Sequence, residues 1–253
     1  MFARLENKIL NFIGPPNACG TTNKVKRDQW VKKVLAQIPT GSRILDAGAG
    51  ESQYKRFCTN LDYVAQDFGR YNGEGNKSGL QTSNWDQSKL NIVSDITAIP
   101  EPDDSFDAIM CTEVFEHLPN PRAAVKEFSR LLRPGGALIL TAPFCSLTHF
   151  APYHFQTGYN RYFYEDCLEQ YGFDIKELEY NGNYFEYIAQ ELRRIPSVVK
   201  KYAASMPKPV RLRRFIIEFA NRIILILLAK ASAYENGSHE LLCFGLHVGA
   251  KKR

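Results

Sequence analysis

Apolar and polar positions alternate along most of the chain with the two periods of an α/β protein. Apolar residues at helical spacing, such as Trp30, Val31, Val34 and Leu35, predict helices at 24–38, about 121–132 and 162–171. Short apolar or alternating runs bounded by Gly, Pro or Asn predict strands at 42–50, 61–67, 91–95, 106–112, 137–142, 173–180 and 240–250. Residues 68–90 are rich in Gly, Asn and Ser and are expected to form a loop. Strands that alternate with helices predict a parallel sheet covered on both faces.

About 55 residues of helical character, roughly 184–238, separate the last two predicted strands. Within them, 211–231 (RLRRFIIEFANRIILILLAKA) carries a polar stripe of Arg211, Arg214, Glu218 and Arg222 beside an apolar side. The polar residues make this helix unsuited to spanning a bilayer. Three interpretations remain: the apolar side packs on the protein's own domain, lies in a membrane interface, or forms a dimer contact.

Composition and charge narrow the class of protein. The chain has 253 residues, 44% hydrophobic and 23% charged, which is typical of a globular protein and excludes a disordered one. The six cysteines show no C-x-x-C spacing, so we expect free thiols rather than zinc ligands or disulfides. The N-terminal residues resemble neither a signal peptide nor a spanning helix, and we expect a cytoplasmic protein.

The charge is unevenly distributed. Residues 1–192 hold 19 basic and 24 acidic side chains, whereas residues 193–253 hold 13 basic and 3 acidic ones. This basic C-terminal quarter is either a solvated face or an attraction site for an anionic partner, such as a phosphate-bearing substrate, a nucleic acid or an acidic membrane.

The strongest chemical signal is the run ILDAGAG at 44–50, a strand that enters a glycine turn. A dinucleotide site requires a third glycine where this chain has Gln53, and Asp46 before the turn suits a cationic ligand better than a pyrophosphate. Asp67 follows Gly48 by 19 residues at the end of the second predicted strand. In nucleotide-type folds, an acidic side chain at this position accepts hydrogen bonds from the ribose hydroxyls.

Five motifs in order make the chain similar to class I S-adenosylmethionine-dependent methyltransferases, in the branch that includes ubiquinone and menaquinone pathway enzymes. They are DAGAG, the acid after the second strand, SDITAIP, FDAIMCTEVFEHLPNP and LLRPGGALILTAP. The resemblance covers about 42–144. It implies an α/β fold with a Rossmann-like, seven-stranded, mostly parallel sheet, helices on both faces and an antiparallel last strand. The whole of 1–253 is then expected to be one methyltransferase domain, with an N-terminal helical segment at 1–41 and a helical insertion at about 184–238.

The resemblance also implies the cofactor, S-adenosyl-L-methionine, and the residues that bind it: Asp46, Gly48, Gly50, Asp67, Asp95, Ile96 and Glu113. The first three would hold the amino-acid end, and Asp67 the ribose. Asp95 and the backbone of Ile96 would border the adenine, and Glu113 would lie near the methionyl part. For Asp95, a helix N-cap or turn role is an equal alternative.

His117 is the favoured general base, because it follows the fourth predicted strand at the edge where ligands collect. The alternative is a structural His that braces the loop before Pro119. Glu113, Glu116 and His117 form an E-x-x-E-H run, which some ubiquinone-pathway and small-RNA ribose methyltransferases use for a metal; here we expect no metal.

The aromatic segment 144–164, with His149 and His154, is expected to form a lid or an acceptor pocket, or else to pack as a buried loop. The favoured function is methyl transfer to a small-molecule or lipid-linked acceptor, on oxygen or carbon because no N-P-P-Y signature is present. A nucleic-acid methyltransferase, a non-catalytic or membrane-associated scaffold and an NAD enzyme are the alternatives, in that order. Peripheral membrane contact through 211–231 is expected in the membrane interpretation.

Overall fold

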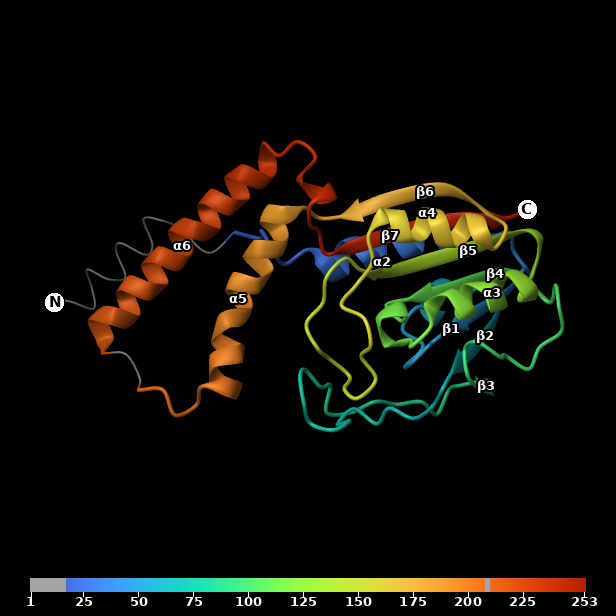
Figure 1. Ribbon diagram of the computed structural model, residues 1–253, viewed down its shortest axis with the longest axis horizontal. Coiled ribbons are helices and arrows are strands. Elements are labelled where there is room, and N and C mark those ends of the chain that lie inside the picture. Colours follow the sequence, from blue (N-terminus) through green and yellow to red (C-terminus); the bar gives the residue numbers. More distant parts are fainter. Residues whose placement is uncertain (1–16, 208–209) are drawn as a thin grey trace. The chain divides into compact units, whose positions relative to one another are not determined.

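The structure is a computed structural model that describes residues 17–207 and 210–253 (Figure 1). The chain divides into two compact units. One contains Val25–Asn181 and Gly245–Arg253, and the other contains Gly182–Phe244 together with residues 17–24. Of the predicted N-terminal segment at 1–41, residues 1–16 lie outside the described part.

The larger unit is built on a seven-stranded sheet with the order β3-β2-β1-β4-β5-β7-β6. The first five strands pair in parallel, and β7 runs antiparallel to both of its neighbours, β5 and β6. This confirms the predicted Rossmann-like sheet with an antiparallel last strand. The strands are β1 (Arg43–Ala47), β2 (Asp62–Asp67), β3 (Ile92–Val93), β4 (Phe106–Thr112), β5 (Leu132–Pro143), β6 (Phe173–Asn181) and β7 (Gly245–Lys252).

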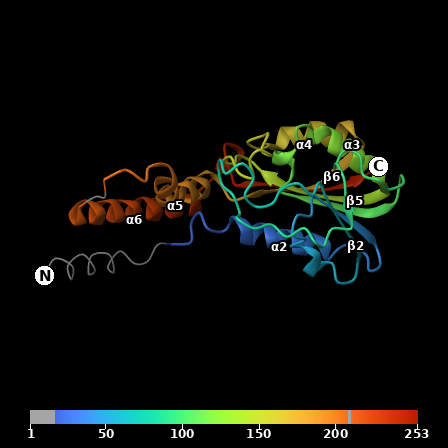
Figure 2. The same cartoon turned by 90° about the horizontal axis from the view of Figure 1, so that it is seen from below.

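Helices cover both faces of this sheet, as predicted. Helix α2 (Asn23–Leu35) lies on one face, and α3 (Pro121–Leu131) and α4 (Arg161–Gln170) lie on the other (Figure 2). Short 3-10 helices follow β1 at Lys55–Phe57 and β4 at Phe115–His117. Asn120 and Asn160 cap α3 and α4, because each side-chain oxygen accepts the backbone N–H three residues later.

The core beneath α2 explains why this helix docks on the sheet. Trp30, Val31 and Leu35 are buried against sheet residues that include Ile44 and Met110. Each such side chain contributes roughly 1.5–3 kcal/mol when it is fully buried. The Trp30 ring also stacks on His247 of β7, with ring centroids 5.0 Å apart.

Two strand boundaries differ from the sequence predictions. Strand β5 begins directly after α3, because a bulge between its pairings with Phe106 and Ala108 accommodates residues 133–136. Strand β7 begins at Gly245 rather than 240, since residues 238–240 form a 3-10 helix. The six cysteines are free thiols, as predicted.

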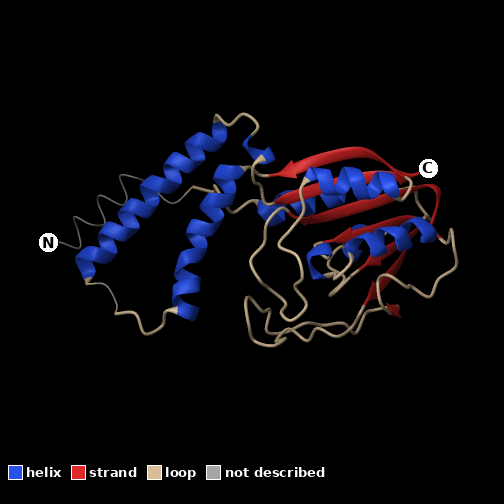
Figure 3. Ribbon diagram, in the orientation of Figure 1, coloured by secondary structure: helices blue, strands red, loops and turns tan. Residues whose placement is uncertain are grey.

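Two long loops without helices, 68–91 and 144–160, leave the sheet at the carboxyl ends of β2 and β5 (Figure 3). The first includes the predicted 68–90 loop. Backbone hydrogen bonds join them: Leu80 N–H donates to Thr148 O at 2.9 Å, and Phe150 N–H donates to Leu80 O at 3.0 Å. The loops therefore form one structure above the sheet edge.

The smaller unit contains α5 (Tyr184–Tyr202) and α6 (Arg211–Ala233). The two helices lie side by side, with a 2.9 Å hydrogen bond from Asn183 Nδ2 to Ser232 Oγ. Leu225 of α6 is buried, but most large apolar side chains of the helix are exposed. None of the described helices is long and apolar enough to cross a membrane.

Candidate functional site

The glycine turn after β1 allows two close approaches that no side chain would permit. Gly48 has φ +76°, and a Cβ at this position would lie 2.5 Å from Val114 Cγ2. Gly50 has φ +52°, and its Cβ would lie 2.6 Å from Trp85 Cζ2. The N–H groups of Gly48 and Ala49 both donate to the Gln66 carbonyl, at 2.9 and 2.8 Å, which fixes the turn against β2.

Asp67, at the end of β2, faces this turn. Its carboxylate accepts a 3.0 Å hydrogen bond from the Gly50 N–H and one of 3.2 Å from Gln87 Nε2. Burial raises the pKa of Asp67, although the hydrogen bonds from backbone N–H groups oppose that increase. The carboxylate is thus held against the turn after β1, and the strand order reverses between β1 and β4, which is where open α/β sheets bind ligands.

A cavity of about 490 Å³ opens beside the turn. It collects six residues that the sequence placed in the site, from four separate segments: Gly48, Gly50, Asp67, Asp95, Ile96 and His117. The rest of its wall includes Phe68, Tyr71, Trp85, Val114, Leu118, Phe150, Tyr153 and Phe155. A few polar groups are therefore set into a largely apolar cavity, as is common for small-molecule sites.

Asp46 lies in the strand beneath the turn rather than in the cavity wall. It is buried, and its Oδ2 accepts a 2.6 Å hydrogen bond from the Tyr63 hydroxyl. Burial raises the pKa of Asp46 to about 7; the Tyr63 hydrogen bond opposes this increase, and the Asp67 charge adds to it.

Glu113 is also absent from the cavity wall. Its Oε2 pairs with Arg27 Nη1 of α2 at 2.6 Å, and its Oε1 accepts a 3.0 Å hydrogen bond from Thr141 Oγ1. The residue has φ +55°, a conformation that bulky residues rarely adopt, so this contact with α2 is held at the expense of backbone strain.

Asp95 is both a turn residue and a residue of the cavity wall, which the sequence left as alternatives. Its Oδ1 accepts hydrogen bonds from the backbone N–H and the hydroxyl of Thr97, at 2.8 and 2.7 Å, and these bonds lower the pKa of Asp95. It is therefore a turn residue that also borders the cavity, next to the buried Ile96.

Tyr71 and Trp85 are wall residues that the sequence did not reveal. The rings of Tyr71 and Phe150 stack with centroids 4.5 Å apart, and Trp85 meets the Phe150 ring edge-on at 5.0 Å. Phe150 belongs to the predicted aromatic lid, whereas the other two come from the 68–91 loop. Large aromatic residues in an otherwise Gly- and Asn-rich loop were the available signal.

His117 stacks on Phe150 with ring centroids 5.1 Å apart. Its Nδ1 lies 2.6 Å from the Tyr153 carbonyl, which can only accept, so Nδ1 carries the proton and Nε2 the lone pair. Burial lowers the pKa of His117 to about 3, and the nearby His149 and His154 add to the decrease. A group with this pKa is a weak proton acceptor at neutral pH.

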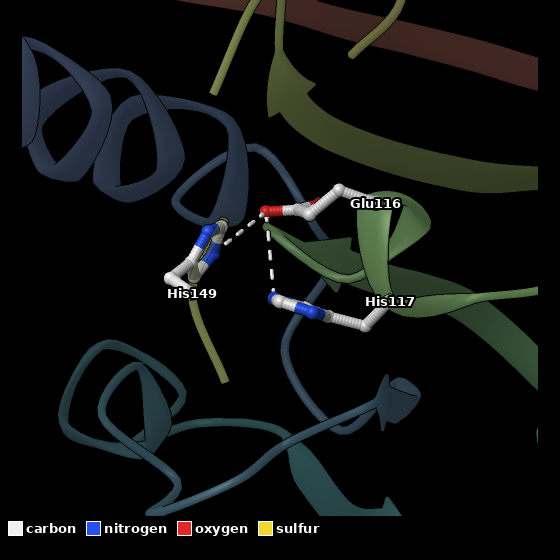
Figure 4. A group of neighbouring side chains, drawn as sticks. All are labelled: Glu116, His117 and His149. Atoms are coloured by element: carbon white, nitrogen blue, oxygen red, sulfur yellow. Dashed lines mark ion pairs between the residues drawn. The ribbon is translucent and has the colours of Figure 1, made fainter. Parts of the chain in front are cut away.

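Figure 4 shows that Glu116, His117 and His149 point toward one another. Glu116 Oε1 lies 3.7 Å from Nε2 of both His117 and His149, and the His149 Nδ1 donates to the Leu147 carbonyl at 2.8 Å. Two imidazole nitrogens and a carboxylate thus converge within 4.8 Å. Glu113, the first acid of the E-x-x-E-H run, is paired with Arg27 instead.

Burial raises the pKa of Glu116 well above its ordinary value, and the Glu113 charge adds to the increase. Within the described ranges, Glu116 Oε2 and His117 Nε2 are buried without a hydrogen-bond partner. Buried polar atoms are normally satisfied, so this cluster has the donor set and the unmet demand of a site for a divalent cation. Imidazoles whose Nδ1–H is held by a backbone carbonyl are oriented as metal-binding histidines usually are.

Comparison with known proteins finds a family match in the central part of this sheet. Residues 45–140 match the family model described as a methyltransferase domain. Residues 45–140 form a methyltransferase domain. The domain contains all of the predicted cofactor residues and His117, whereas His149 and Phe150 lie beyond the matched residues.

Curated relatives match about half of the chain. It is 32% identical over 144 residues to a ubiquinone biosynthesis O-methyltransferase of Xanthomonas oryzae pv. oryzae, covering 55% of this chain and 58% of that protein. A protein of the same name from Xylella fastidiosa is 30% identical over 135 residues, covering 51% of each chain. The chain thus spans little more than half the length of the curated relatives it matches.

Solved structures share the fold around the methyltransferase domain. A SAM-dependent methyltransferase from Archaeoglobus fulgidus has a TM-score of 0.51 at 18% identity, covering 89% of this chain and 94% of the other. The Haemonchus contortus phosphoethanolamine N-methyltransferase 2, solved with S-adenosyl-L-methionine, has a TM-score of 0.50 at 15% identity, covering 90% and 52%.

Proposed function

We propose that this protein transfers a methyl group from S-adenosylmethionine to a small-molecule or lipid-linked acceptor, most suitably on oxygen. The observation that carries the proposal is the cavity that joins the Gly48–Gly50 turn and Asp67 to an aromatic wall. Its glycine turn and acidic groups suit a nucleoside and an amino acid, and its aromatic residues suit an apolar molecule. Both reactants could therefore meet in one space.

S-adenosylmethionine is the cofactor of the methyltransferase domain. We propose that Gly48 and Gly50 leave room for its amino-acid end and that Asp67 accepts hydrogen bonds from the ribose hydroxyls. Asp95 and Ile96 border the adenine. Asp46, directly beneath the turn, supplies negative charge for the cofactor's ammonium group once its carboxyl ionises. Glu113 acts indirectly, because its pair with Arg27 fixes the start of the segment that carries Val114 and His117.

The aromatic wall favours a flat, largely apolar acceptor. Tyr71, Trp85 and Phe150 pack ring to ring in this wall. A planar molecule that adds to this cluster would gain about 0.5–1.5 kcal/mol for each aromatic contact beyond burial. An oxygen acceptor is in keeping with the curated relatives, which are named as O-methyltransferases of ubiquinone biosynthesis. Because the sulfonium is already an activated leaving group, the protein's main task is to align acceptor, methyl and sulfur.

Two measurements test this proposal. Calorimetric titration should give micromolar affinity for S-adenosylmethionine, about −8 kcal/mol, and a clear loss in Asp67→Ala. A labelled methyl-transfer assay against pools of phenols, quinol precursors, lipids, sugars and RNA should then give product with the aromatic pool. Equal cofactor binding by wild type and variant contradicts the site. Product with RNA alone supports a nucleic-acid enzyme, and cofactor binding with no product in any pool supports a scaffold.

We also propose a second site beside the cavity, in which Glu116, His117 and His149 bind a divalent cation. The two Nε2 atoms 3.7 Å from one carboxylate oxygen favour it over the expectation of no metal. An ion there would polarise a hydroxyl of the acceptor and lower its pKa, which replaces the need for a strong protein base. Such a role suits His117 better than proton abstraction does, since its own pKa is about 3.

A further inference from the structure

One face of α6 is apolar and exposed. Eight large apolar side chains of this helix have between 36% and 60% of their surface accessible: Leu212, Ile216, Ile217, Phe219, Ile223, Ile224, Ile226 and Leu227. At 100° per residue they occupy about half of the circumference, opposite the buried Leu225. Amphipathic helices normally bury this face, so its exposure implies a partner.

Of the described polar stripe of α6, only the C-terminal part packs toward the helix's own unit. Arg222 keeps only 19% of its side-chain surface and pairs with Glu218 at 2.9 Å, and Asn221 is half-buried. Around Leu225, polar residues therefore lie toward the helix's own unit and apolar residues toward the outside, whereas Arg214 and Glu218 nearer the start of the helix are exposed. The side chain of Arg211 lies outside the described part of the chain.

The segment that carries this face is strongly basic. Residues 193–234 contain ten Lys and Arg against one acidic residue, Glu218. Arg213, Arg214 and Lys230 of α6 are exposed and form no ion pair within the described ranges. Charge of one sign around an apolar face selects an anionic partner.

The connection between α5 and α6 also has exposed apolar side chains beside basic ones. Tyr202, Met206 and Val210 are 61%, 53% and 67% exposed, and Lys200 and Lys201 in the last turn of α5 are exposed beside them. Aromatic and aliphatic side chains next to lysines are typical of segments that rest at a lipid headgroup boundary.

We propose that the exposed face of α6, with the preceding connection, binds the surface of an anionic lipid bilayer. The apolar side chains would enter the boundary between headgroups and acyl chains, while Arg213, Arg214 and Lys230 contact lipid phosphates. A second copy of this chain suits the face less well. A dimer seam occupies a narrower stripe than this one, and pairing two such segments would bring like charges together.

Vesicle sedimentation tests the proposal with the full-length protein. We expect it to sediment with vesicles of phosphatidylcholine containing 30% phosphatidylglycerol at low salt, and to be released at high salt. The variant R213E/R214E should bind roughly 25-fold more weakly or worse, since each basic residue near such a surface contributes about fivefold. The variant I216S/F219S should lose binding because it removes two inserted side chains.

Matched controls distinguish binding through the face of α6 from non-specific binding through other exposed residues. Leu241→Ser removes an apolar side chain that is 70% exposed outside α6, and Lys176→Glu reverses an exposed charge on β6; both should sediment like the wild type. Circular dichroism should show every variant folded. Failure of the wild type to bind anionic vesicles overturns the proposal, as does equal binding by the α6 variants.

A stable dimer in analytical ultracentrifugation that I216S/F219S dissociates, without vesicle binding by the wild type, would assign the face to a second copy. The outcome is independent of methyl transfer, because cofactor binding is measured separately in the cavity of the other unit. Only the further step, that the membrane presents a lipid-linked acceptor, rests on the proposed function.

Discussion

Asp46 Oδ2 lies 2.6 Å from the hydroxyl of Tyr63, and the pair is buried beneath the glycine turn of the methyltransferase domain. This is the one short polar contact that the Asp46 carboxyl makes in the described structure, so burial dominates its chemistry and raises its pKa to about 7. A carboxyl group that is half protonated near neutral pH therefore lies beneath the turn where we propose that the cofactor's amino-acid end binds.

Cofactor affinity should consequently depend on pH. Below its pKa the neutral Asp46 cannot pair with the cofactor's ammonium group, so the affinity for S-adenosylmethionine should be about tenfold weaker at pH 6 than at pH 8. Tyr63→Phe removes a hydrogen bond that lowers this pKa and should move the transition to higher pH, whereas Asp46→Asn should abolish it. Calorimetric titrations at several pH values give the comparison. Constant wild-type affinity from pH 6 to 8 would contradict the role of Asp46.

Substitutions at Gly50 and Gly135 distinguish the cost of backbone strain from the cost of a steric clash. Both have positive φ, but a Cβ on Gly50 would lie 2.6 Å from Trp85 whereas one on Gly135 meets nothing within 4 Å. Gly135→Ala should cost about 1 kcal/mol of unfolding free energy and leave cofactor affinity unchanged. Gly50→Ala should add a displacement of Trp85 and weaken cofactor binding at least tenfold. Denaturant melts and titrations of both variants decide this. If both retain wild-type affinity, the close approach at Gly50 is not needed for the ligand.

The Arg27–Glu113 pair should hold α2 to the segment after β4. Burial alone would lower the pKa of Arg27, yet the Glu113 and Tyr54 contacts raise it above its ordinary value. Arg27→Met and Glu113→Gln should each destabilise the fold by about 2 kcal/mol, between the values for exposed and for buried pairs, because each leaves a partly buried charged partner. The double variant should cost less than the sum of the two. Additive losses in denaturant melts would mean that the two side chains do not interact energetically.

His247 should make the fold sensitive to acid. Burial lowers its pKa to about 4, and the Arg27 charge adds to the decrease. Because the unfolded histidine titrates near 6.5, the unfolded chain binds a proton that the folded one rejects as pH falls from 6.5 to 4. The full stability is present above pH 6.5, and about 3 kcal/mol is lost by pH 4. His247→Phe keeps a ring against Trp30 and should show that much less acid sensitivity in melts from pH 4 to 7. Parallel pH profiles for both proteins would rule out this contribution.

Metal content distinguishes the two roles considered for His117, metal ligand and general base. If Glu116, His117 and His149 bind a divalent ion, the purified protein should contain about one ion per chain by elemental analysis, and a chelator should reduce turnover. His149→Ala should lose the ion, while His154→Ala, whose ring lies beside the cluster with Nε2 on Ser146 Oγ, should retain it.

The opposite result supports His117 as the general base. If the chelator has no effect and His117→Ala lowers turnover roughly 100-fold with unchanged cofactor affinity, then His117 acts on the acceptor proton without a metal. Loss of both turnover and cofactor affinity would instead make His117 a structural residue that braces the cavity wall.

The sequence alone determined the sheet and the position of its ligand site. Apolar runs that end in DAGAG, in Asp67 and in the segment before Asp95 mark the carboxyl ends of parallel strands, and topology brings those ends to one edge. Local patterns suffice there, because β1 and the end of β2 are buried and the turn residues are constrained by their backbone angles. Six of the predicted site residues accordingly line one cavity.

Tertiary structure alone decided which side chains meet across long separations. It turned Glu113 toward Arg27, 86 positions earlier in the chain, and brought His149 to Glu116 and His117 through the pairing of two loops that carry no periodic pattern. It also set which face of α6 is exposed. The apolar period shows that a helix has two faces, but only the packing of Leu225 and Arg222 within their own unit determines which face is left to a partner.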